Sequence, residues 1–272
     1  MRLIRFRHEP TGRALAGVDC GDGTALPLAG RVTDPLEPID EPVEFSPAQL
    51  LAPIDRPPAI LAIGLNYREH ATEQGKEPPE RPMLFMKNPA TLNGPFADIV
   101  IPKACQSREQ VDYEAELAVV IKRDCRDVSR TDAGEFVLGY TVANDVSARW
   151  WQKHGGGGQF VRGKSFDGFC PIGPALVTAD EIDDPHDLRI STKLNDEVMQ
   201  DSTTGDMIFS IAELIEFLSQ GTTLLAGTLI LTGTPAGVGF ARTPPVWLKP
   251  DDVVEIEIER IGAIRNRVRL EE

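Results

Sequence analysis

Seven prolines between residues 35 and 58 set the strongest limit on how this chain can fold. They are Pro35, Pro38, Pro42, Pro47, Pro53, Pro57 and Pro58. Proline fixes φ and has no backbone N–H, so neither a helix nor a central strand tolerates this spacing. We therefore expect residues 34–58 to form an extended connection with one short helical turn near Pro47. The connection divides the chain into a small N-terminal domain, residues 1–58, and a large domain, residues 59–272.

Strand patterns dominate both parts of the chain. Short strands are predicted in residues 1–33, and longer ones at 59–65, 111–123, 227–233, 253–259 and 263–270, with an Asn195-Asp196 hairpin turn. The clearest helix starts after Ser210, which caps it and forms a capping box with Glu213. Because strands and helices do not alternate regularly, the sequence predicts a mostly β, α+β fold rather than a Rossmann or TIM architecture.

The charge balance excludes several classes of partner. Acidic residues outnumber basic ones by 42 to 28, for a formal net charge of −14. Such a field repels phosphate backbones and anionic lipids, so we expect no nucleic acid or membrane partner. A small anionic substrate would need a local positive centre. The four cysteines form no C-x-x-C pair, and the first residues lack a secretory pattern, which favours a reduced, cytoplasmic protein.

One motif match is misleading. Residues 158–165 fit the nucleotide-binding pattern G-x-x-x-x-G-K-[ST] letter for letter. That pattern works only between an entering strand and a leaving helix. Here a predicted helix and four glycines precede the segment, and a run with two prolines follows it. We therefore predict no nucleotide binding by this segment.

Acidic side chains provide the first indication of a functional site. Glu114 and Glu116 lie two residues apart on a predicted strand and share one face. Asp145 begins a predicted helix over 144–154. Arg149 and Gln152 follow it at i+4 and i+7, on the same face of that helix. The pair of glutamates and the helix face could each simply be exposed to solvent. The three carboxylates also suit a hard cation such as Mg²⁺. His70 and Glu73, one helical turn apart, form a candidate oriented base.

Five motifs give the chain a specific resemblance. They are GLNYREH (64–70), DYEAELAVVI (112–121), GYTVANDVSAR (139–149), GKSFDGFCPIGP (163–174) and LTGTPAGVG (231–239). In this combination and order the chain resembles the fumarylacetoacetate hydrolase family. The second half is most similar to the subgroup of fumarylacetoacetate hydrolase domain-containing protein 2 and its bacterial relatives.

The resemblance implies a catalytic domain of layered, rolled β-sheets, a small N-terminal domain and a homodimer. It implies Mg²⁺ or Mn²⁺ held by Glu114, Glu116 and Asp145. It further implies that His70 and Glu73 activate water and that Lys164 is a cation facing the substrate. The same resemblance places three more residues in the pocket lining: Arg149, Gln152 and Thr234.

The expected chemistry is metal-dependent and acts on a small, anionic 2-oxo acid through a metal-bound enolate. Hydrolytic C–C cleavage of an acylpyruvate or another 2,4-dioxo acid is the first expectation, because both His70 and Glu73 are present. The alternatives are oxaloacetate tautomerisation or decarboxylation and isomerisation of 2-hydroxyhepta-2,4-diene-1,7-dioate. A non-enzymatic binding protein is the remaining alternative.

Overall fold

The computed structural model describes all 272 residues and confirms a mostly β fold of layered, mixed sheets with few short helices. A 12-stranded sheet has the order β4-β3-β2-β1-β14-β12-β11-β17-β6-β7, with β5 and β8 paired beside it. Its strands are β1 (Arg2–His8), β2 (Arg13–Asp19), β3 (Thr24–Leu28), β4 (Val43–Glu44), β5 (Leu50–Leu51), β6 (Ile60–Gly64), β7 (Met83–Lys87), β8 (Leu92–Asn93), β11 (Ala115–Ile121), β12 (Val137–Asn144), β14 (Cys170–Thr178) and β17 (Leu229–Leu231).

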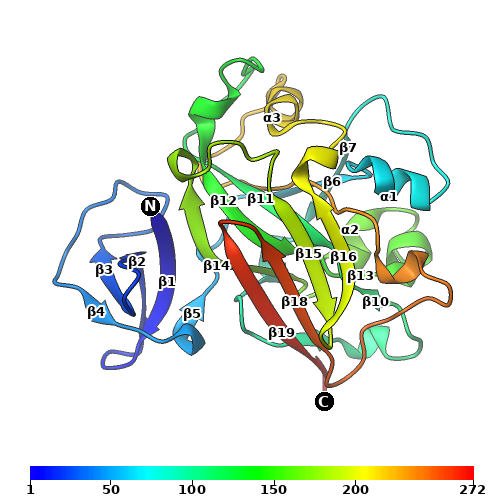
Figure 1. Ribbon diagram of the computed structural model, residues 1–272, viewed down its shortest axis with the longest axis horizontal. Helices are drawn as coiled ribbons and strands as arrows, with labels where there is room; N and C mark the ends of the chain where they lie inside the picture. Colours follow the sequence, from blue (N-terminus) through cyan, green and yellow to red (C-terminus); the bar gives the residue numbers. More distant parts are fainter.

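A five-stranded sheet lies across the central strands of the large sheet (Figure 1). Its order is β16 (Glu197–Thr203), β15 (Arg189–Leu194), β18 (Val253–Ile258), β19 (Gly262–Leu270) and β9 (Ile99–Ile101). A third, two-stranded sheet pairs β10 (Val111–Asp112) with β13 (Ser147–Ala148). The helices are α1 (Arg68–Glu73), α2 (Phe160–Lys164), α3 (Ile211–Ser219) and a π-helical turn (Trp151–Gly155). None combines the length and the apolar character needed to cross a bilayer.

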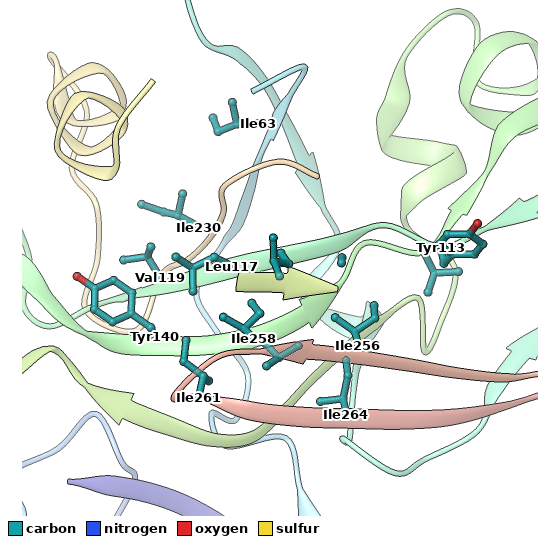
Figure 2. Packing of buried hydrophobic residues seen from close by; sticks show 14 of the residues in the cluster. Ile63, Tyr113, Leu117, Val119, Tyr140, Ile230, Ile256, Ile258, Ile261 and Ile264 are labelled. Atoms are coloured by element: carbon teal, nitrogen blue, oxygen red, sulfur yellow. The ribbon is translucent and has the colours of Figure 1, made fainter. Parts of the chain in front are cut away.

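The main core fills the space between the two large sheets. Figure 2 shows Leu117 and Val119 of β11 packed over Ile256 and Ile258 of β18. Because successive side chains of a strand alternate between faces, the even positions of β11 lie on the other side of the sheet. A second, smaller core lies there. Both faces of β11 are therefore buried, which explains its nearly continuous run of apolar residues.

The N-terminal strands form a lobe at one edge of the molecule, to the left in Figure 1. Strand β1 pairs antiparallel with β14, so the lobe continues the large sheet. Within the proline-rich connection only the short strands β4 and β5 and one helical turn, Pro47–Gln49, form. This confirms the predicted extended connection. The division at residue 58 into two domains stays a prediction.

Several local predictions are confirmed. Helix α3 begins after Ser210, whose hydroxyl accepts from the Glu213 backbone N–H, while the Glu213 carboxylate accepts from the Ser210 backbone. Asn195 and Asp196 both adopt positive φ between β15 and β16, as a tight hairpin requires. Strands β18 and β19 form the predicted antiparallel pair.

Two local predictions are wrong in part. The strand expected over 111–123 breaks between β10 and β11, because the Glu114 N–H donates to the Asn144 side chain instead of to a neighbouring strand. The helix expected over 144–154 begins only at Arg149. Its first residues are drawn into the β10–β13 pairing, so hydrogen bonds to neighbouring strands override the local helical pattern.

Candidate active site

The three predicted metal ligands converge at the end of strand β11. Glu114 lies in the break before this strand, Glu116 lies within it, and Asp145 directly follows β12. The antiparallel pairing of β11 with β12 brings Ala115 opposite Asn144, which places the acidic residues beside one another. One carboxylate oxygen from each of the three lies within 4.8 Å of the others, and all three residues are buried.

Buried cations hold two of these carboxylates. Lys164 Nζ donates to Glu114 at 2.5 Å and to Asp145 at 2.6 Å. Lys87 Nζ, at the end of β7, donates to the second oxygen of Asp145 at 2.5 Å. Arg149 reaches the second oxygen of Glu114 at 2.7 Å. Burial alone would raise the pKa of Glu114, but Lys164 and Arg149 hold that pKa at about 2.

Glu116 has no cation of its own. One of its oxygens accepts from the Gly233 N–H at 2.7 Å, and the other makes no hydrogen bond. Gly233 has a φ of +100°, a backbone conformation that glycine readily adopts. Burial, together with the charges of Asp145 and Glu114, raises the pKa of Glu116 well above its ordinary value. A cluster of three oxygen donors with a shortage of positive charge fits a hard divalent cation such as Mg²⁺ or Mn²⁺.

The sequence motif around Lys164 has a structural explanation unrelated to nucleotides. Lys164 is the last residue of α2, and a helical turn rather than a strand precedes this segment. A Cβ on Gly163 would lie 2.3 Å from the Gln152 backbone nitrogen, so glycine is required for α2 to pack this closely. This approach lets Lys164 reach the acids. Burial lowers the pKa of Lys164, but Asp145 and Glu114 more than offset it, and the net pKa is raised.

Arg149 connects the acidic cluster to a residue that the sequence analysis did not select. It donates from Nε and an NH2 group to Asp112 at 2.9 and 2.7 Å, and from its other NH2 group to Gln152. Asp112 also accepts the backbone N–H groups of Gly239 and Phe240. The alternation of Asp112 with Glu114 and Glu116 was the signal that could have identified it. Lys87 shows no comparable pattern in the sequence.

The predicted base pair forms within helix α1. His70 Nδ1 lies 2.5 Å from a Glu73 oxygen, and the other Glu73 oxygen accepts the Gly237 N–H at 2.9 Å. His70 Nε2 lies 2.7 Å from the side-chain nitrogen of Gln74. With its Nδ1 proton donated to Glu73, His70 presents an electron pair on Nε2. Gln74, which the sequence analysis did not select, donates to this atom.

Asn66 fixes the position of this helix. Its side chain accepts from the Phe209 N–H and donates to the carbonyl groups of Phe209 and Thr232. The buried amide therefore ties the segment before α1 to the end of β17 and to residues 207–209. Arg68 adds bonds from α1 to the carbonyl groups of Asp206 and Met207. These contacts give a structural reason for two of the sequence motifs, GLNYREH and LTGTPAGVG.

The convergent side chains line one pocket of about 80 Å³. Seven of the nine predicted site residues line it: His70, Glu114, Glu116, Arg149, Gln152, Lys164 and Thr234. The other two, Glu73 and Asp145, lie behind them and contact His70 and Lys164. Pockets that hold drug-sized molecules are usually about 300 Å³ or more, so this one favours a small substrate.

Comparison with known proteins assigns the fold to a family. Residues 59–269 match the family described as fumarylacetoacetate (FAA) hydrolase C-terminal. The chain belongs to the fumarylacetoacetate hydrolase family. Among curated relatives, the bovine oxaloacetate tautomerase FAHD2A, mitochondrial, is 48% identical over 223 residues, covering 82% of this chain and 70% of that protein. Oxaloacetate tautomerase YisK of Bacillus subtilis is 47% identical over 227 residues, covering 82% and 74%.

The solved structures extend the likeness to the whole chain. The 2-hydroxyhepta-2,4-diene-1,7-dioate isomerase from Mycobacterium marinum superposes with a TM-score of 0.83 at 36% identity, covering 100% of this chain and 99% of that one. The family resemblance inferred from the sequence motifs is thus confirmed. The similarity to the subgroup of fumarylacetoacetate hydrolase domain-containing protein 2 is confirmed as well. The chain has the fold of an enzyme family whose members include tautomerases and isomerases by name.

Proposed function

We propose that this chain is a divalent-metal-dependent oxaloacetate tautomerase, which interconverts the enol and keto forms of a small 2-oxo dicarboxylic acid. The observation that carries the proposal is the convergence of His70 and Lys164 with the acidic cluster on one small pocket. Two relatives at 47–48% identity bear that activity in their names. This proposal puts the tautomerase alternative ahead of the hydrolysis that we expected first from the sequence.

We propose Glu114, Glu116 and Asp145 as the ligands of Mg²⁺ or Mn²⁺. When bound, such an ion supplies Lewis-acid polarisation of the substrate's keto oxygen. Lys164 uses two of its three N–H groups on carboxylates, and the third is available to donate to a substrate oxygen. Arg149 and Gln152 line the same pocket and orient the substrate, and Thr234 closes one wall.

His70 is the proposed proton carrier. In ketonisation, C3 of the enol gains a proton and the hydroxyl at C2 loses one to solvent. In ketonisation, His70 first takes a proton from solvent at Nε2 and then delivers it to C3; in the reverse direction, the electron pair on Nε2 of the neutral imidazole removes a proton from C3. Glu73 holds the imidazole through Nδ1 and is itself fixed by Gly237. Because Gln74 donates to Nε2, its amide has to move aside when the substrate enters.

Two relatives that are named oxaloacetate tautomerases support tautomerisation over hydrolysis. The pocket volume suits both substrates, because the acetyl group of acetylpyruvate is about as large as the second carboxylate of oxaloacetate. The His70–Glu73 pair is the observation that keeps hydrolysis as a second candidate, because the same pair could activate water.

A substrate panel with product analysis separates the two candidates. With Mg²⁺, we expect the wild-type protein to accelerate the loss of enol-oxaloacetate absorbance and to release no pyruvate from acetylpyruvate or fumarylpyruvate. His70→Ala should lower the rate by about 100-fold or more, the usual contribution of a general acid-base group. His8→Ala, in the N-terminal lobe, is the matched control and should keep the wild-type rate. Pyruvate release from an acylpyruvate, with oxaloacetate converting only at the Mg²⁺-alone rate, would instead establish a hydrolase.

The homodimer implied by the resemblance stays a prediction. Strand β7 forms one of the two edges of the large sheet, and its Met83, Leu84 and Met86 are exposed. An exposed apolar edge strand offers unpaired backbone groups to another chain. We therefore propose β7 as part of the surface that a second copy covers.

A further inference from the structure

Two lysines line the solvent side of the pocket without a partner in the chain. Lys76 follows helix α1, and Lys153 lies in the π-helical turn; both residues are exposed. Neither forms an ion pair or a side-chain hydrogen bond. They differ in this respect from Lys87 and Lys164, whose ammonium groups are bound to buried carboxylates. Neither residue was singled out by the sequence pattern.

The position of Lys153 is fixed over the pocket by an aromatic ring. Its Nζ lies 4.3 Å from the centre of the Phe240 ring, and the Arg149 guanidinium lies 4.4 Å from the same ring. Both contacts are within the range of a cation–π interaction. Although Lys153 is exposed as a residue, partial desolvation of its ammonium group beside Phe240, followed by the charges of Arg149 and Lys76, lowers its pKa. Positive charges are thus concentrated at this end of the pocket, and an anion would relieve their repulsion.

The charges of the inner site show why a second anion site is needed. Four contacting carboxylates face three cations there: Asp112, Glu114, Glu116 and Asp145 against Lys87, Arg149 and Lys164. These groups carry one negative charge in excess, and a bound divalent ion changes this to one positive charge in excess. One substrate carboxylate neutralises that excess. A second carboxylate on the same substrate would find no free positive charge in the inner site.

We propose that Lys153, together with Lys76, forms the subsite for the second carboxylate of a short 2-oxo dicarboxylate and so selects dicarboxylates over monocarboxylates. The proposal rests on the proposed function, whose substrate class it explains. The small volume of the pocket limits the substrate to a few carbon atoms between its two carboxylates. The lysines act in binding, and the proton transfer is assigned to other residues.

Binding of two matched probes tests this subsite without turnover. Malate and lactate have the same 2-hydroxy acid head, and only malate carries a second carboxylate. By calorimetry with saturating Mg²⁺, we expect wild type to bind malate at least about 10-fold more tightly than lactate, the scale of a charge-assisted hydrogen bond. In the double variant Lys76→Met/Lys153→Met, the ratio of malate affinity to lactate affinity should fall to about 1–2, with lactate affinity unchanged. The single variant Lys153→Arg keeps the positive charge and should keep most of the preference for malate.

Lys103→Met is the control for loss of a lysine charge, because Lys103 lies in an exposed turn outside the pocket. It should leave the malate-to-lactate ratio at the wild-type value. A ratio that is the same in wild type and in the double variant overturns the subsite. If wild type fails to tautomerise oxaloacetate but shows the lysine-dependent ratio, the proposed function falls and the subsite stands.

Discussion

Replacing Glu116 with glutamine should abolish metal-dependent activity without destabilising the protein. The amide oxygen of Gln can still accept the Gly233 N–H, which is the one hydrogen bond that Glu116 makes. The charged form of Glu116 is disfavoured by burial and by Asp145 and Glu114, so a neutral residue of the same shape relieves repulsion in the metal-free protein. The loss of one ligand should weaken Mg²⁺ binding by about 100-fold or more.

The two effects are measured separately. Calorimetry gives the Mg²⁺ affinity, and thermal unfolding in EDTA gives the stability of the metal-free chain. We expect the midpoint of unfolding in EDTA to be equal to or higher than that of wild type, while added Mg²⁺ raises the midpoint of wild type alone. A Glu116→Gln variant that binds Mg²⁺ as tightly as wild type would remove Glu116 from the proposed ligand set.

Replacing Asp112 with alanine should cause the largest loss of stability of any single change considered for this site. Its ion pair with Arg149 is almost fully buried, with side-chain exposures of 0% for Asp112 and 6% for Arg149. Removing one partner of a buried pair typically costs about 3–5 kcal/mol. Arg149 keeps its contact with Glu114, but its Nε and one of its NH2 groups lose their buried acceptor. The Gly239 and Phe240 N–H groups also lose their acceptor.

The exposed pair between Arg189 and Asp201 provides a matched control. Arg189 donates through Nε and one NH2 group, as Arg149 does, but it reaches both oxygens of Asp201, at 2.7 and 2.9 Å, whereas both groups of Arg149 donate to one Asp112 oxygen. Its side chains are 66% and 48% exposed, and solvent screens their attraction. Urea unfolding should therefore show a large loss of free energy for Asp112→Ala and little measurable change for Asp201→Ala. Equal effects of the two changes would contradict the importance that we give to burial.

Local patterns predicted the elements whose signals lie within a few residues. The capped helix α3, the Asn195-Asp196 turn and the β18–β19 pair depend on short-range chemistry, and they form as expected. The segment around Asp145 differs because its hydrogen bonds go to residues far along the chain, such as Gln110. A helical spacing of charged residues could not reveal that competition, since strand partners are set by the tertiary fold.

The same distinction applies to the candidate site. The acidic residues and the His70–Glu73 pair could be found because their members are close in sequence or belong to recognisable motifs. Lys87 contacts Asp145 across 58 positions, and nothing in its neighbourhood marks it. Gln74 was missed for another reason. A glutamine next to a histidine pair is chemically unremarkable until the structure shows that it donates to Nε2.

Proton exchange at C3 of oxaloacetate tests the central claim most directly. A single base at His70 can reach only one face of the enol, so in deuterated water with Mg²⁺ the protein should introduce one deuterium at C3 with one configuration. Nuclear magnetic resonance follows this exchange and any release of pyruvate in the same sample. We predict stereospecific exchange that is faster than with Mg²⁺ alone, that is lost in EDTA and that falls about 100-fold in His70→Ala. Exchange at the Mg²⁺-alone rate, or equal labelling of both C3 positions, would contradict a tautomerase built on these residues.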